Sequence, residues 1–296
     1  MENILDVKNL SVLLDTSEKQ SLLVDNVSFS LRPGECLGIL GESGSGKSLT
    51  VKSILGLLDN SFKISGEAFY KNKDLLQESK ENLRKIRGRS ITMVLQNPMT
   101  CFDQLCRIGD QIGETFAAHL GLDEKAIREK AISTLEKMLI RDPEEVLEKF
   151  PHQLSGGMLQ RIMIGIATAM EPDLLVADEP TTAIDAITQY EILEEFLRIK
   201  NESNTAVIFI THDLGVVSKL ADKIIVMSKG KVVDRGDFKH IVTAASDPYT
   251  RLLVEKEPPL CAGTGNLLIR REVKGSAEIK RYLRQLPQRA TKKFLR

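Results

Sequence analysis

A glycine-rich loop between an apolar run and a helical pattern constrains this chain more than any other feature. Residues 41–48 read Gly-Glu-Ser-Gly-Ser-Gly-Lys-Ser, after an apolar run at 36–40 and before apolar residues at helical spacing in 49–58. Backbone N–H groups of such a loop point inward at a helix N-terminus, where the helix dipole adds positive potential. The spacing therefore predicts a phosphate-binding loop, and the strand, lysine and serine together disfavour an ordinary glycine-rich turn. The predicted binding residues are Gly41, Glu42, Ser43, Gly44, Ser45, Gly46, Lys47, Ser48 and Leu49.

Two acids end a second apolar run. Residues 174–177 lead directly into Asp178 and Glu179. Taken alone, this is also the pattern of a strand that leaves the core into a charged loop. Beside a phosphate-binding loop, we expect Lys47 to reach the β- and γ-phosphates and Ser48 to bind Mg²⁺ together with Asp178. Glu179 is then placed to polarise an attacking water.

A second anion site is predicted at the start of another helical pattern, residues 158–170. Ser155 supplies a helix cap and the two glycines after it leave backbone N–H groups bare. One chain needs only one phosphate cradle, so this one is expected to serve the γ-phosphate of a nucleotide held by a partner in a head-to-tail dimer. A merely well-capped helix is the alternative interpretation. The residues of this predicted site are Leu154, Ser155, Gly156, Gly157, Met158 and Gln160.

With these motifs in this order, residues 1–254 resemble the ATP-binding subunits of ABC transporters, and residues 154–160 resemble the family signature. Gln96 matches the family glutamine that senses Mg²⁺ and the attacking water, and His212 matches the switch histidine at the γ-phosphate. Ala183, Ile184 and Asp185 match the loop that crosses the dimer interface, with Ile in place of the usual Leu. The resemblance implies ATP and Mg²⁺ as cofactors. It also implies two sets of roles: catalysis by Glu179, His212 and Gln96, and Mg²⁺ ligation by Ser48, Gln96 and Asp178.

The sequence differs from the family pattern at the residue that contacts the adenine base. The family usually stacks adenine on an early aromatic side chain, yet residues 5–24 contain no Phe, Tyr or Trp. The contact to adenine stays open.

The fold class follows from alternating apolar and helical segments. Strand-like runs occur at residues 4–7, 23–31, 36–40 and 91–95, and again at 174–177, 206–210 and 224–227 with helical patterns at 188–200 and 214–220 between them. Continuous apolar strands that alternate with helices predict a mostly parallel sheet buried on both faces. We therefore expect an α/β P-loop NTPase (ABC ATPase) core from residues 1–96 and 171–254, with a small antiparallel β region. A helical signature subdomain, residues 97–170, is expected to be inserted in it, with a helix over 123–139.

Residues 1–254 and 255–296 carry opposite net charges. The 41 basic and 41 acidic residues cancel, but residues 255–296 carry a net +7, which leaves −7 on residues 1–254. The acidic body argues against a nucleic-acid partner. The basic C-terminal extension offers Ile279, Tyr282, Leu283 and Leu286 at helical spacing, so a short amphipathic helix and a disordered, solvated appendix both stay open.

Location follows from what the chain lacks. No run approaches the roughly 18 consecutive apolar residues of a membrane span, and residues 1–7 do not form a secretory leader. The four cysteines fit no zinc spacing and are expected to be plain thiols. With the resemblance, this implies a peripheral position at the cytoplasmic face of the cell membrane.

Several segments resemble the peptide and nickel importer branch of the family. They are residues 178–182, 211–217 and, above all, Asp-Pro-Tyr-Thr-Arg-Leu-Leu at 247–253. Residues 156–161 and 96–98 favour nickel or a nickel chelate as cargo, with a di- or oligopeptide as the alternative. The implied partners are two transmembrane permease subunits, a second ATPase subunit and, indirectly, an extracytoplasmic substrate-binding protein; residues 97–110 are the expected permease contact. A soluble, non-transport ABC ATPase is the competing class.

Overall fold

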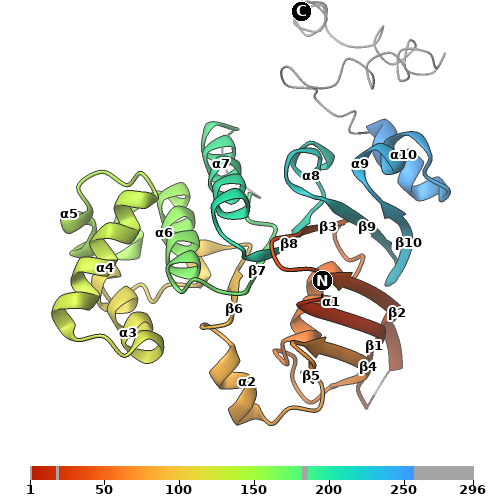
Figure 1. The fold of residues 1–296 in the computed structure, drawn as a ribbon, viewed down its shortest axis with the longest axis horizontal. Coiled ribbons are helices and arrows are strands. Elements are labelled where there is room, and N and C mark those ends of the chain that lie inside the picture. Colours follow the sequence, from red (N-terminus) through yellow and green to blue (C-terminus); the bar gives the residue numbers. More distant parts are fainter. Residues whose placement is uncertain (1, 18–19, 182–185, 257–296) are drawn as a thin grey trace, which may run out of the picture.

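The computed structural model describes residues 2–17, 20–181 and 186–256, with the backbone alone for 186–188. Within these residues the strands form two sheets (Figure 1). The first is six-stranded, in the order β10-β9-β3-β8-β7-β6, and the second is four-stranded, in the order β2-β1-β4-β5. Residues 182–185, which include Ala183, Ile184 and Asp185, and residues 257–296 lie outside the described residues.

The six-stranded sheet is the centre of the molecule. Its strands are β3 (Cys36–Leu40), β6 (Ile91–Val94), β7 (Leu174–Asp178), β8 (Ala206–Thr211), β9 (Lys223–Ser228) and β10 (Lys231–Gly236). All neighbours pair in parallel except β9 and β10, which are antiparallel. Every residue of β3, β7 and β8 is buried, because other elements cover both faces of the sheet. The predicted α/β fold with a mostly parallel sheet is confirmed.

The second sheet is antiparallel and encloses a core with the central sheet. It consists of β1 (Leu5–Asp15), β2 (Gln20–Leu31), β4 (Phe62–Tyr70) and β5 (Lys73–Asp74). Apolar residues of β1 and β2 pack with Val51 and Ile54 of α1 (Lys47–Ile54) and with Ile39 of β3. The strands β1 and β2 are longer than their apolar runs at 4–7 and 23–31 predicted, since their outer ends pair with each other and need only one buried face. α2 (Lys80–Ile86) follows this sheet.

Helices gather at one end of the central sheet (Figure 1). They are α3 (Ile108–Leu120), α4 (Glu124–Lys137), α5 (Pro143–Leu147) and α6 (Gly156–Ala169), with short 3₁₀ turns η1 (Pro98–Thr100) and η2 (Pro151–Gln153). Phe116, Leu135 and Ile162 are fully buried between them. The helix expected over 123–139 is α4, and Asp123 caps it by accepting from the N–H of Ala126 at 2.8 Å.

The remaining helices lie against the other strands. α7 (Ala186–Glu202) covers the central sheet, where Phe196 packs edge-to-face on Phe209 of β8. α8 (Leu214–Leu220) begins and ends where the sequence predicted. α9 (Phe238–Thr243) and α10 (Pro248–Lys256) close the described chain beside β9 and β10 (Figure 1).

The hairpin between β9 and β10 fixes the glycine-rich loop in place. Its two turn residues, Lys229 and Gly230, have φ of 48° and 81°, as a two-residue turn of the primed type requires. Gly230 donates its N–H to the carbonyl of Ser45 at 3.0 Å and accepts from the N–H of Asp25 at 2.8 Å. The turn therefore ties the loop to the antiparallel sheet.

Cys36, Cys101 and Cys106 are free thiols, as expected; Cys261 is outside the described residues. Among the helices described, none combines the length and apolarity needed to cross a bilayer.

Candidate functional site

The glycine-rich loop connects β3 to α1, and two of its glycines are required by geometry. A Cβ atom on Gly41 would lie 2.3 Å from the backbone oxygen of Met227, so no side chain fits there. Gly46 precedes α1 with φ of 101°, a conformation that L side chains rarely adopt. The loop thus delivers backbone N–H groups to the N-terminus of α1, the arrangement that binds phosphate.

Lys47 supplies the positive charge of the loop. Its side chain is almost fully buried, and its ammonium donates to the carbonyl oxygens of Gly41 at 2.7 Å and Glu42 at 2.9 Å. Glu179 Oε1 lies 3.6 Å from Lys47 Nζ. Burial lowers the pKa of Lys47, and the charge of Glu179 opposes this effect. The ammonium is therefore held at the mouth of the loop by oxygen acceptors.

Ser48 and Asp178 meet from opposite sides of the site. Ser48 Oγ donates to Asp178 Oδ1 at 2.6 Å, although the two residues are 130 positions apart. Burial raises the pKa of Asp178, and the Ser48 hydrogen bond partly offsets this rise. A hydroxyl and a buried carboxylate are hard oxygen donors, and Mg²⁺ commonly takes one or two protein oxygens and completes its shell with water and phosphate. The pair fits Mg²⁺, and a cation there would relieve the cost of the buried carboxylate.

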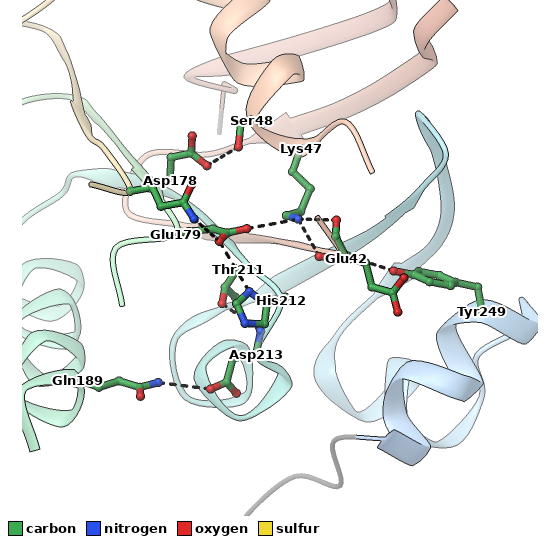
Figure 2. A network of polar contacts seen from close by, with 12 residues as sticks. Glu42, Lys47, Ser48, Asp178, Glu179, Gln189, Thr211, His212, Asp213 and Tyr249 are labelled. Atoms are coloured by element: carbon green, nitrogen blue, oxygen red, sulfur yellow. Dashed lines mark hydrogen bonds and ion pairs between the residues drawn. The ribbon is translucent and has the colours of Figure 1, made fainter. Parts of the chain in front are cut away.

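Glu179 is the meeting point of the polar network (Figure 2). It follows β7 with φ of 49°, a strained conformation for a residue with a side chain, and its N–H donates to the carbonyl of Ile210 at 2.9 Å. Gln96 Nε2, just beyond β6, donates to Glu179 Oε2 at 3.0 Å. His212 Nδ1 lies 3.8 Å from the same oxygen. The three residues predicted as catalytic are thus within reach of one another.

The His212 side chain is half exposed, and hydrogen bonds of the residues on either side of it hold its backbone in place. Asp213 donates its N–H to Thr211 Oγ1 at 3.0 Å, and its carboxylate caps α8 by accepting from Gly215 at 2.7 Å. Gln189 Nε2 of α7 reaches Asp213 Oδ2 at 3.3 Å. Sequence reasoning missed Thr211, Asp213 and Gln189; the Asp directly before the helical run 214–220 was the cap signal that points to Asp213.

The predicted second anion site is at the N-terminus of α6, in a different part of the molecule. Ser155 caps the helix by accepting from the N–H of Met158 at 3.2 Å, and a Cβ atom on Gly156 would meet nothing within 4 Å. Ser155 and Gly156 are exposed, whereas Leu154, Gly157 and Met158 are partly buried. Between described residues, no hydrogen bond or ion pair joins 154–160 to the loop 41–48. This helix end therefore makes no polar contact with the chain's own loop.

Gln160 differs from the rest of that predicted site. Its side chain is fully buried, and neither amide atom has a hydrogen-bond partner. Its carboxamide is therefore not on the surface beside Ser155. Glutamine at this position gave no sequence signal for burial, because a polar side chain is expected to be exposed.

The family profile described as "ABC transporter" matches residues 24–182, which include the loop, Gln96, residues 154–160 and the two acids Asp178 and Glu179. The chain belongs to the ABC transporter family. A dipeptide transport ATP-binding protein of Bacillus subtilis, DppD, is 45% identical over 88% of this chain and 78% of its own length. The ATP-binding protein of a metal-staphylopine import system in Staphylococcus aureus, CntD, is 41% identical over 85% of this chain and 92% of its own.

Solved ABC cassettes share the fold. The dimeric ATP-binding cassette MJ0796 in a post-hydrolysis state, bound to ADP and Pi, aligns with a TM-score of 0.71 at 26% identity, over 79% of this chain and 98% of the cassette. The structure of cbiO1 from Clostridium perfringens, part of the ABC transporter complex cbiONQ, aligns with a TM-score of 0.68 at 26% identity, over 86% of this chain and 94% of its own.

One cleft of this ABC protein lies between the central sheet and the helical region. It has a volume of about 450 Å³ and borders both β6 and α3. Apolar lining comes from Leu95 and Phe102, and acidic lining from Asp103, Asp110 and Glu114. The cleft includes part of segment 97–110, which the sequence indicated as a contact for a partner.

Proposed function

We propose that this chain is the ATP-hydrolysing subunit of an ABC importer and that residues 41–49 bind the phosphates of ATP. The observation that carries the proposal is the convergence of Lys47, Ser48, Asp178, Glu179 and Gln96 at the carboxyl ends of β3, β7 and β6. Ligands of open α/β sheets bind at the carboxyl ends of the strands. Family membership supports ATP as the nucleotide.

The side chains divide the chemistry. Glu179 orients a water for in-line attack on the γ-phosphate, and Gln96 holds the carboxylate by donating to it. Lys47 and His212 stabilise the negative charge that develops on the phosphoryl oxygens. Ser48, Asp178 and Gln96 would hold Mg²⁺, which would neutralise phosphate charge.

A second ATPase subunit completes the site in this proposal. Residues 154–158 at the N-terminus of α6 contact the γ-phosphate of the nucleotide held by the partner, in a head-to-tail dimer. The exposed Ser155 and Gly156 support this role, and the related cassette MJ0796 was solved as a dimer. Residues Ala183, Ile184 and Asp185 are proposed to cross the interface.

The partners in the membrane are two permease subunits, which place the chain peripherally at the cytoplasmic face. The acid-lined cleft beside β6 supports a permease contact, because Leu95 lines it and directly precedes Gln96, which donates to Glu179 at the nucleotide site. An extracytoplasmic substrate-binding protein is an indirect partner.

The proposed division of the chain follows these roles. Residues 1–96 and 171–254 form the ATP-binding core, residues 97–170 form the helical signature subdomain, and residues 255–296 form the basic extension. The packing of α3, α4 and α6 on one another, with Phe116, Leu135 and Ile162 buried between them, supports a helical subdomain, and its apolar cluster continues into the central strands β7 and β8.

Short peptides are the proposed cargo, since the B. subtilis relative is a dipeptide transport protein. A metal chelate is the second candidate, supported by the metal-staphylopine system. Nickel, which the sequence favoured, has no specific support from these names and remains one test cargo among others.

The experiment is expression with candidate permeases, followed by purification and assay in proteoliposomes. We expect co-purification with two hydrophobic permease chains and ATP-dependent uptake of labelled di- and oligopeptides, tested beside Ni²⁺ alone and a Ni²⁺ chelate. Lys47→Ala is expected to abolish uptake and ATP binding. ATP hydrolysis by a chain that never associates with permeases would instead favour a soluble ABC ATPase, and retained ATP binding by Lys47→Ala would contradict the site.

A further inference from the structure

The last helix of the described residues, α10, contacts the phosphate-binding loop directly (Figure 2). Tyr249 accepts a hydrogen bond on its phenol oxygen from the N–H of Glu42 at 2.8 Å. Lys256 Nζ, at the end of the same helix, lies 3.5 Å from Glu42 Oε1. The ion pair is exposed and contributes little, so the hydrogen bond to the phenol is the stronger of these two polar contacts.

That hydrogen bond acts on a peptide unit that Lys47 also uses. The N–H of Glu42 and the C=O of Gly41 belong to the same peptide group, which is planar. Lys47 Nζ donates to this carbonyl at 2.7 Å. The phenol thus binds the N–H of this peptide group, and the ammonium binds its C=O, which points in the opposite direction within the same plane. A contact that fixes the direction of the N–H therefore also fixes the direction of the carbonyl. Each hydrogen bond also polarises the other through the amide.

Tyr249 is held in place by an apolar cluster and by a hydrogen bond of its backbone. Its ring packs in an apolar cluster with Leu40 at the end of β3, Leu214 at the start of α8 and Leu253 of α10. Its backbone N–H donates to Asp247 Oδ1 at 2.8 Å. Burial raises the pKa of the Tyr249 phenol, so the hydroxyl is neutral at physiological pH.

We propose that Tyr249 is a positioning residue that orients the Gly41–Glu42 peptide group and through it the Lys47 ammonium, so that α10 sets the affinity of the loop for nucleoside polyphosphates. This inference rests on the proposed role of Lys47 in binding the β- and γ-phosphates. A purely structural contact, which only anchors α10, is the alternative outcome. The two differ in selectivity, because Lys47 reaches the terminal phosphates, which AMP lacks.

The test measures binding of trinitrophenyl-labelled ATP and AMP by fluorescence, with the full chain and Mg²⁺. Tyr249→Phe removes the phenol oxygen and keeps the ring. Tyr190→Phe is the matched control, since Tyr190 is an exposed side chain on α7. We expect Tyr249→Phe to raise the Kd for labelled ATP roughly 3- to 10-fold, as one lost neutral hydrogen bond does, while labelled AMP changes little and Tyr190→Phe matches the wild type.

The Lys47→Ala variant distinguishes failure of the inference about Tyr249 from failure of the proposed phosphate site. If Lys47→Ala loses labelled ATP but Tyr249→Phe binds it like the wild type, the positioning role is wrong and the proposed site stands. If Tyr249→Phe weakens ATP and AMP by the same factor, the contact is structural and the inference is also wrong. If Lys47→Ala binds labelled ATP normally, the proposed phosphate site fails and the inference fails with it.

Discussion

Gln96 donates its side-chain amide to Glu179 Oε2 at 3.0 Å across 83 positions of sequence. The two residues follow β6 and β7, which pair in parallel, so the carboxyl ends of the strands bring them together. The same carboxylate lies 3.6 Å from the ammonium of Lys47 and 3.8 Å from the imidazole of His212. An acceptor-only carboxylate among three potential donors is oriented by its neighbours before any substrate arrives.

Glu179→Gln tests the role of this carboxylate. We expect ATP binding to persist, because the loop and Lys47 stay intact, while hydrolysis falls by about 10²- to 10⁴-fold for loss of a general base. Binding is measured by fluorescence and turnover by phosphate release in the complex with the permeases. Glu129→Gln, at an exposed position on α4, is the matched control and should leave turnover unchanged. Near-wild-type turnover by Glu179→Gln would remove Glu179 from this role.

Ser155→Arg tests the site formed with a second subunit. The substitution removes the cap of α6 and places a bulky cation on the exposed helix end. We expect it to block hydrolysis without weakening ATP binding to the variant chain, because the loop 41–48 is elsewhere. Ser79→Arg is matched, since Ser79 caps α2 by accepting from Asn82 at 3.2 Å and is also exposed. Normal hydrolysis by Ser155→Arg with its partners would contradict the composite site.

The sequence predicted the parallel part of the fold well, for a physical reason. Strands covered on both faces need unbroken apolar runs, and those of β3, β7 and β8 stand out for that reason. The strand β4 was missed because its outward residues are polar and Gly66 interrupts it. The sequence also predicted that the glycine-rich loop lies beside Asp178 and Glu179. The structure shows why they meet: β3 and β7 belong to the parallel part of one sheet, and the carboxyl ends of parallel strands lie at the same edge.

The contacts made by single polar groups could not be predicted. Nothing in the sequence places the Tyr249 phenol on the N–H of Glu42, because that distance depends on how α10 packs in the last apolar cluster. An Asp before a Pro is typical of a helix start, as at Pro248, but it does not give the direction of the helix. The buried amide of Gln160 is likewise a product of packing around α6.

Gln160→Met tests the cost of that buried amide. Both polar atoms of Gln160 are buried without partners, which costs stability, whereas methionine is apolar and of similar shape. We expect the free energy of unfolding of the nucleotide-free chain to rise by about 1–2 kcal/mol in urea titrations. Gln153→Met provides the contrast, since Gln153 Oε1 accepts from the N–H of Phe150 at 2.8 Å and its loss should destabilise. A destabilised Gln160→Met chain would mean that the amide is satisfied in solution.

Asp234 anchors the segment that leads into α10, and the stability that its carboxylate contributes to the fold depends on pH. Its Oδ1 accepts from Ser246 Oγ at 2.8 Å and its Oδ2 from the N–H of Asp247 at 3.0 Å. Burial alone would raise the pKa of Asp234, but hydrogen bonds to the carboxylate outweigh it and the pKa lies below the usual value. A depressed pKa stabilises the fold at pH above the unfolded value of about 3.9, and this stabilisation is lost as pH falls through the folded value.

Asp234→Asn should therefore lower the free energy of unfolding by about 1.5–3 kcal/mol at pH 7, the range for hydrogen bonds to a charged group. The difference from the wild type should shrink as pH falls below about 3.9, where the unfolded carboxylate begins to take up a proton, and should be lost once pH falls through the depressed pKa of the folded state. Urea unfolding over a pH series measures both values. Asp237→Asn is the matched control, because Asp237 caps α9 at an exposed position and asparagine caps equally well. A pH-independent difference for Asp234→Asn would assign its effect to packing instead of charge.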